Sequence, residues 1–272
     1  TKVFTQSQPG DLPTERDDEW VIHIQPEESL QLLHKLKESQ ATGPDGFPAK
    51  CLKLSADIIC NPLTHIYNTI IEQRTFPTCW KISFVSLIPK SARVSLDSIR
   101  PISLLSIISK IFERFLVHEM KSLLLNNYGP NQYGFIPKSS TVSALIYLHD
   151  HVTRHLDNPS TTAAAIIVFD LSKAFDWIPH HQLLSSLYST DLPLGFAKLI
   201  SSYLLDRFQY VRVSNFTSQL TPVTSGVPQG AILSPLLFCV YTRDIQLPNS
   251  HAALIKNADD STATLAFTKD SN

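Results

Sequence analysis

The stretch Ala163-Ala164-Ala165-Ile166-Ile167-Val168-Phe169-Asp170 decides the fold. A short, continuous apolar run of this kind is typical of a β-strand that is covered on both faces. Its last residue is an acid, and an unpaired carboxylate is unfavourable against apolar surroundings. The run therefore predicts a buried strand that ends at a polar site containing Asp170.

A second pair of acids follows near the end of the sequence. Ala252–Lys256 and Thr262–Phe267 flank Asn257-Ala258-Asp259-Asp260, which predicts a β-hairpin with acids at its tip. Mg²⁺ prefers oxygen ligands and would offset the unfavourable placement of this pair and of Asp170 against apolar strands. Two metal ions about 3.5–4 Å apart are a known device for in-line phosphoryl transfer. Taken alone, Asp-Asp is also an ordinary turn former, so both interpretations stay open.

A low-bulk loop and two cations complete the candidate site. Ser225-Gly226-Val227-Pro228-Gln229-Gly230-Ala231 would let a ligand or a backbone approach closely, and Gln229 offers both a donor and an acceptor. Lys90 closes the strand predicted at Phe84–Pro89, and Arg100 opens a second extended piece. Both cations suit triphosphate oxygens. Each feature alone also fits an ordinary loop or a solvated surface charge.

The remaining elements follow from periodicity and turn signals. Helices are expected at 27–38, 48–60, 62–73, 109–125, 139–156, 181–189, 194–206 and 235–245, and a strand at 209–214. Pro62 is expected at a first helical position. The three tryptophans, Trp20, Trp80 and Trp177, are expected to pack in the interior. Helices followed by strands mixed with helices indicate the α+β class.

Composition excludes several classes of protein. Of 272 residues, 43% are apolar and 17% charged, which excludes wholesale disorder. Lys and Arg number 23 against 24 Asp and Glu, which excludes a globally basic coat for nucleic acid but leaves a local basic groove possible. No run reaches the roughly 18 apolar residues of a membrane span, so no membrane partner is expected. The four cysteines lack CxxC spacing and are expected to be free thiols in a reducing compartment.

Taken together, the motifs resemble those of reverse transcriptases from non-LTR, LINE-type retrotransposons, with the jockey-like group most similar. The resemblance covers about residues 40–265, and its motifs stand in the order of the family. They are Gly43-Pro44-Asp45-Gly46, Ile88-Pro89-Lys90, Arg100-Pro101-Ile102-Ser103-Leu104-Leu105-Ser106, Gln132-Tyr133-Gly134-Phe135 with Ser140-Thr141, Phe169-Asp170-Leu171-Ser172-Lys173-Ala174-Phe175-Asp176, Gly226-Val227-Pro228-Gln229-Gly230-Ala231-Ile232-Leu233-Ser234-Pro235-Leu236-Leu237-Phe238, and Ala258-Asp259-Asp260.

The resemblance implies a right-hand polymerase fold with an antiparallel palm sheet packed on helices. A polar lead-in would span 1–26, fingers with part of the palm 27–160, and the palm with the catalytic acids 161–267. A truncated tail would follow at 268–272, with the thumb missing, so the chain is expected to be a piece of a longer polypeptide. The implied location is intracellular, in cytoplasm and nucleus. The oligomeric state is left open.

The resemblance also implies the chemistry. The reaction would add deoxynucleotides to the 3′ end of a DNA primer on an RNA template. Asp170, Asp259 and Asp260 would hold two Mg²⁺ ions, with Mn²⁺ as a possible substitute. Lys90 and Arg100 would hold the triphosphate, and Gln229 would lie beside the incoming nucleotide. Phe175 would act as an aromatic gate against the 2′-hydroxyl by which ribose differs from deoxyribose; core packing is the other interpretation of this side chain.

Three departures from the family pattern support a second hypothesis. Asn257 stands where the family has an aromatic residue, Ile136 where it has Arg, and Pro179 where it has a small polar or acidic residue. The alternative is therefore a degenerate, catalytically silent reverse-transcriptase-like fragment that acts only as a binding or structural module. A third hypothesis, an RNA-templated RNA polymerase, is disfavoured by the bulky ring of Phe175.

Overall fold

The structure is a computed structural model that describes residues 20, 22–89, 99–124, 128–129, 131–171, 173–213, 215–247 and 252–268. Lys90 lies outside the described residues, as do 1–19 and 21 of the expected lead-in and 269–272 of the expected tail.

Runs of one to three helices are followed by runs of one to three strands along the chain, which agrees with the expected α+β class. In order they are α1 (Pro26–His34), α2 (Ala49–Leu54), α3 (Ala56–Gln73), the 3₁₀ turn η1 (Thr78–Trp80), β1 (Ile82–Pro89), β2 (Ile99–Leu104), α4 (Ile107–Leu123), α5 (Thr141–Leu156), β3 (Thr161–Asp170), α6 (His180–Tyr188), α7 (Leu194–Leu204), β4 (Arg207–Val213), β5 (Phe216–Thr217), β6 (Thr221–Val223), α8 (Ser234–Thr242), β7 (Ala252–Asn257) and β8 (Asp260–Thr268). Most ends fall within a few residues of those expected.

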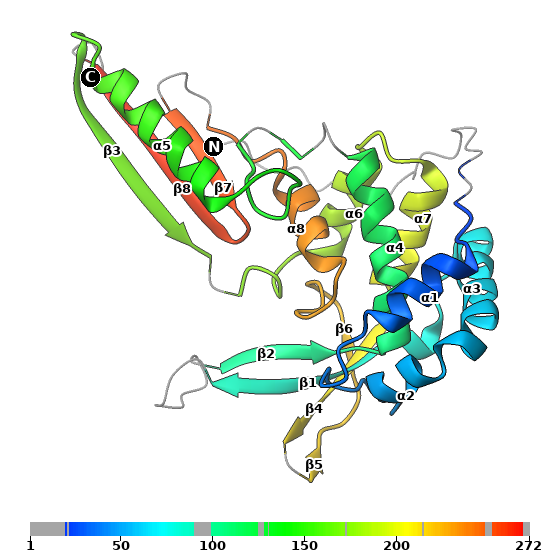
Figure 1. Cartoon of the computed structure of the whole chain (residues 1–272). Helices are drawn as coiled ribbons and strands as arrows, with labels where there is room; N and C mark the ends of the chain where they lie inside the picture. Colours follow the sequence, from blue (N-terminus) through cyan, green and yellow to red (C-terminus); the bar gives the residue numbers. More distant parts are fainter. Residues whose placement is uncertain are drawn as a thin grey trace.

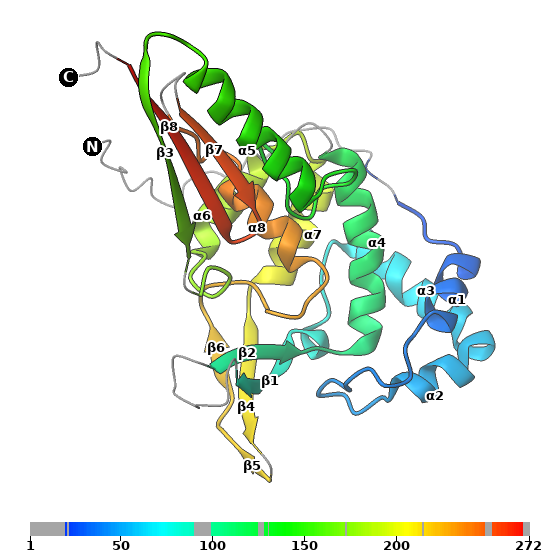
Figure 2. The same cartoon turned by 60° about the vertical axis from the view of Figure 1, so that its left-hand side comes forward.

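An antiparallel sheet of three strands, in the order β3-β8-β7, carries the acids. Helix α5 packs against all three strands, and in Figures 1 and 2 this sheet and α5 form one unit at the upper left. The expectation of an antiparallel sheet packed on a helix is therefore confirmed.

The expectation that the apolar strand is covered on both faces is wrong. Strand β3 lies at the edge of its sheet, where β8 is its single partner among the described strands. Side chains on both faces of its second half are exposed, with Val168 at 69% and its neighbour Ile167 at 41%. An apolar run shows that a strand can be buried, but whether it is covered depends on segments elsewhere in the chain.

The second sheet is mixed. β1 pairs antiparallel with β2 and parallel with β4, and β4 also pairs with β5 and β6. In Figure 1 this sheet lies in the lower part of the molecule, apart from the three-stranded sheet. The main hydrophobic core lies among the helices, where Tyr67, Phe112 and Phe196 are fully buried.

The break between α2 and α3 falls at Ser55, so the expected boundary before Pro62 is wrong. Pro62 lies inside α3, where it lacks the N–H that a helix interior uses. Leu63 and Tyr67 on the same helix are buried in the core. Tertiary packing of this face therefore outweighs the local cost of the proline.

Two further expectations concern the cysteines and the membrane. All four cysteines are free, as expected. Along the described parts of the chain, the helices are too short or too polar to cross a membrane.

Candidate active site

The adjacent acids lie at the tight turn between β7 and β8. Asn257 and Asp260 are the last paired residues of the hairpin, so that Ala258 and Asp259 form its loop. Ala258 has a φ of 60°, in the left-handed region that residues with a Cβ rarely adopt. The turn thus projects Asp259 and Asp260 from the end of the sheet, as the sequence predicted.

The third acid meets them through strand pairing. Asp170 ends β3 and is the direct register partner of Asp260, the first residue of β8. Opposed residues on antiparallel strands have Cα atoms about 4.5–5.5 Å apart. Two acids that are distant in sequence therefore lie side by side at one end of the paired strands, and Asp259 is next to Asp260 in the turn.

The side chains of Asp170, Asp259 and Asp260 do not form a complete metal site. Among the residues that the structure describes, no group of three or more His, Cys, Asp or Glu side chains is close enough to hold a metal ion. Asp170 and Asp260 are exposed, so their rotamers are not fixed by packing. The donor set of three carboxylates and its backbone placement nevertheless fit a hard divalent cation.

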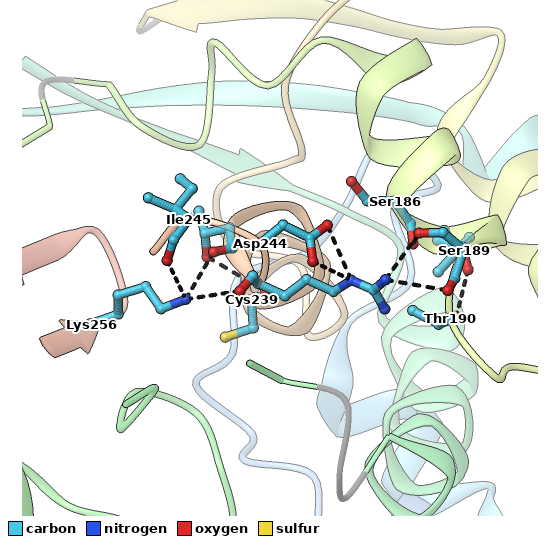
Figure 3. A network of polar contacts seen from close by, with 10 residues as sticks. Ser186, Ser189, Thr190, Cys239, Asp244, Ile245 and Lys256 are labelled. Carbon is cyan, nitrogen blue, oxygen red and sulfur yellow. Dashed lines mark hydrogen bonds and ion pairs between the residues drawn. The ribbon is translucent and has the colours of Figure 1, made fainter. Parts of the chain in front are cut away.

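A buried lysine anchors this hairpin to the end of α8. Lys256, next to the turn, is only 2% exposed, and its Nζ donates to the backbone oxygens of Thr242 at 2.9 Å, Arg243 at 3.3 Å and Ile245 at 3.3 Å. Figure 3 shows these contacts around the Lys256 ammonium. A cation suits the negative end of a helix dipole. Burial lowers the pKa of Lys256.

The segment that contains Gln132-Tyr133-Gly134 holds the same hairpin from the other side. The backbone N–H of Tyr133 donates to the carbonyl of Lys256 at 2.8 Å, and the N–H of Lys256 donates to that of Asn131 at 2.9 Å. A Cβ on Gly134 would lie 2.3 Å from the backbone nitrogen of Ala258. Only glycine allows this approach.

The loop 225–231 is clamped between two neighbours. Gly226 has a φ of 80°, and a Cβ there would lie 2.6 Å from the carbonyl oxygen of Asp176. On the opposite side, Ser103 of β2 donates its N–H to the carbonyl of Gln229 at 2.6 Å. The two glycines predicted a close backbone approach, and the structure shows one at each of them: Gly230 approaches the carbonyl of Ser103.

Gln229 is held by an acid that our sequence analysis did not select. Its Nε2 donates to Oδ1 of Asp176 at 3.0 Å. Burial raises the pKa of Asp176, against the opposing effects of Gln229 and Lys173. The signal was present in the sequence, because Asp176 is the second acid of the motif that begins at Asp170. The adjacent Trp177 is 71% exposed, so the expectation that it packs in the interior is wrong.

Phe175 precedes Asp176 in the loop after β3 and is half-buried. Its ring stacks on that of Phe238 in α8, with centroids 4.9 Å apart and planes 29° apart. The backbone oxygen of Phe175 accepts from the N–H of Val227 at 2.8 Å. This loop therefore brings Phe175 and Gln229 into one assembly.

Arg100 lies elsewhere. It is exposed on β2, where it pairs in register with Ile88 of β1, in the mixed sheet. The three acids belong to the other sheet, so the structure does not bring Arg100 and the acids together on one element. Lys90 lies outside the described residues.

A buried carboxylate binds the backbone that follows the loop 225–231. Glu113 of α4 is fully buried and accepts hydrogen bonds from the N–H groups of Ile232 at 2.7 Å and Leu233 at 3.2 Å. Burial raises the pKa of Glu113, while the bond from Ile232 and the charge of Arg207 oppose the rise. Sequence analysis missed Glu113, because an acid inside an amphipathic helix gives no sign of which loop it will contact.

The sequence of the chain is similar to that of known polymerases. Residues 88–270 match the family described as reverse transcriptase (RNA-dependent DNA polymerase). The chain is 32% identical over 248 residues to a probable RNA-directed DNA polymerase from transposon BS of Drosophila melanogaster, with 87% of this chain and 27% of the relative covered. It is 28% identical over 256 residues to the RNA-directed DNA polymerase from mobile element jockey of Drosophila melanogaster, with 89% and 27% covered. The chain thus spans about a quarter of the length of these relatives.

Proposed function

Because the chain belongs to the reverse transcriptase family, as a domain of the non-LTR, jockey-like kind, we propose that it adds deoxynucleotides to a primer 3′ end on an RNA template. In this proposal, residues 27–160 act as fingers with part of the palm, and 161–267 as the palm. The partners would be an RNA template, a DNA primer and dNTPs. The proposed location is the cytoplasm and nucleus, where target-site reverse transcription would occur.

The observation that supports this proposal is the register of β3 and β8. It aligns Asp170 with Asp260 and leaves Asp259 in the adjoining turn. We propose that these three carboxylates hold two divalent cations, Mg²⁺ or Mn²⁺. When bound, the ions would activate the 3′-oxygen and neutralise charge on the leaving pyrophosphate.

The other residues would bind and orient the nucleotide. Arg100 and Lys90 would donate to triphosphate oxygens, which requires the β1–β2 hairpin to lie over the nucleotide. Gln229 would contact the nucleotide from the clamped loop. Phe175, fixed from behind by the ring of Phe238, would present a rigid edge to C2′ of the sugar.

Primer extension on a homopolymeric RNA template, with Mg²⁺ or Mn²⁺ and with the chain extended into a thumb, tests the proposal. We expect Asp259→Asn to lower extension by at least about 100-fold, since losing a metal ligand should exceed the 10–100-fold cost of losing an outer-shell partner. Asp206→Asn removes an exposed acid before β4 and should extend like the unmodified chain. A folded protein without extension would instead favour the silent binding module. The residue that supports this alternative is Asn257, which stands at the end of β7 in place of the aromatic residue of the family.

A further inference from the structure

Asp176 lies in the loop after β3 and is separate from the proposed metal ligands. Its carboxylate accepts the Nε2–H of Gln229 at 3.0 Å. We infer that Asp176 is a positioning residue that fixes which end of the Gln229 amide faces a bound nucleotide. The inference rests on the proposed function, because it assumes that Gln229 contacts the nucleotide.

The chemistry of the two groups sets the orientation. An ionised carboxylate can only accept hydrogen bonds, whereas an amide has a donor end and an acceptor end. Asp176 therefore requires the NH₂ group of Gln229 to turn toward it. The carbonyl oxygen Oε1 then faces away, where it would accept a hydrogen bond from a donor group of the nucleotide, such as a sugar hydroxyl or a base amino group.

The backbone around the pair leaves little other freedom. Ser225 Oγ donates to the carbonyl oxygen of Asp176 at 3.2 Å, so the two loops are joined directly. The carbonyl of Gln229 is held in turn by the N–H of Ser103. With the backbone fixed on both sides, the side-chain torsions of Gln229 are what remain to be set, and Asp176 restrains them.

The pair is also sensitive to pH. Among the described residues, the charge of Lys173 in the same turn opposes the rise in the pKa of Asp176, and the His180 ring lies with its Nε2 2.7 Å from the carbonyl oxygen of Gly226. The loop 225–231 itself contains no titratable side chain. Protonation turns the Asp176 carboxyl into an O–H donor, and the Gln229 amide is then free to turn its oxygen toward it. Since burial raises the pKa of Asp176, this change occurs at a higher pH than for an exposed aspartate.

Asp176→Asn tests the inference, with Asp206→Asn as the control. The asparagine keeps the size of the side chain but can donate or accept, so either orientation of Gln229 satisfies it. We expect the KM for dNTPs to rise about three- to ten-fold and discrimination against mismatched dNTPs to fall, with kcat changed less than two-fold. The control should change none of these quantities.

A readout without polymerisation separates this inference from the proposed function. In ¹⁵N NMR spectra, the Nε2 resonance of Gln229, assigned by its loss in Gln229→Asn, should titrate with pH in the unmodified chain. It should not titrate in Asp176→Asn. If the unmodified chain does not extend primers, the proposed function fails while this titration still decides whether Asp176 orients Gln229.

Two results would overturn the inference. One is a Gln229 resonance that does not respond to pH in the unmodified chain, a measurement that does not depend on the folding of Asp176→Asn. The other is an unchanged KM and unchanged discrimination in a folded Asp176→Asn chain that extends primers.

Discussion

Asp170 and Asp260 oppose each other directly across the β3–β8 ladder. Like charges in directly opposed positions on a sheet are destabilising. A bound cation would reverse this effect, so Mg²⁺ at about 100 times its dissociation constant should stabilise the chain by about 2.7 kcal/mol. Thermal unfolding with and without Mg²⁺ measures the change. Asp260→Asn should melt higher without Mg²⁺ and lose the response, and an equal response in both chains would contradict the proposed site.

Phe175 should govern the choice of sugar. Phe175→Val removes the bulky edge, so the ratio of kcat/KM for ribonucleotides over deoxynucleotides should rise at least ten-fold. It also removes the ring stacked on Phe238 and should cost about 2 kcal/mol of stability. Phe238→Leu is the matched control, because it disturbs the same packing but keeps the Phe175 ring, and it should change the ratio much less than Phe175→Val. The gate is disproved if both variants alter selectivity equally.

Lys256 should stabilise the hairpin that bears two of the acids. Lys256→Met removes three donors and leaves backbone oxygens at the end of α8 buried without them. We expect a loss of about 1–3 kcal/mol in urea unfolding and faster amide exchange in 131–134 and 252–257. Lys198→Met, on an exposed position of α7, should leave both quantities unchanged. Unchanged exchange in the hairpin of Lys256→Met would show that the anchor is not needed.

Gly226 and Gly46 separate backbone strain from close approach. Both have positive φ, at 80° and 73°, but a Cβ at Gly46 meets nothing within 4 Å. Gly46→Ala should therefore show only the left-handed cost of about 1–2 kcal/mol. Gly226→Ala should lose clearly more stability, since its Cβ would collide with the backbone of Asp176. Equal losses in chemical denaturation would contradict the clamped loop.

Glu113 should give stability a characteristic dependence on pH. Its pKa is raised in the folded chain, so between the ordinary pKa of about 4.3 and the folded value the native state binds more protons than the unfolded state. Stability from this group is thus full below the ordinary pKa and is lost as pH rises through the folded pKa. Glu113→Gln removes the dependence, so the unmodified chain should lose stability relative to the variant as pH rises. A constant difference from pH 4.5 to 8 would contradict the raised pKa.

The local sequence predicted the site better than its surroundings. The family resemblance is confirmed, and so are the hairpin with acids at its tip and the close approach at Gly226. Turn chemistry and glycine act over a few residues, so their signals can be interpreted without knowing the rest of the fold. The roles of Asp170, Asp259, Asp260, Gln229, Phe175 and Arg100 stay predictions.

Long-range contacts could not be inferred in the same way. Pro62 was expected to begin a helix, but burial of the α3 face continues the helix through it. The apolar run of β3 was expected to be covered, but coverage depends on segments far along the chain. Lys256 and Glu113 are charged residues whose buried partners lie on other elements, so periodicity alone marks both as surface side chains.

The pairing of β3 with β8 constrains the lengths of these segments more than their composition. Side chains alternate between the faces of a sheet, so a slip of one residue would send Asp170 to the opposite side from Asp260. Single substitutions at positions other than Asp170 and Asp260 leave this register unchanged, whereas gain or loss of one residue between paired positions displaces the acid. Related chains should therefore hardly vary in length within 163–170 and 260–267, the stretch in which the two strands pair without a register shift.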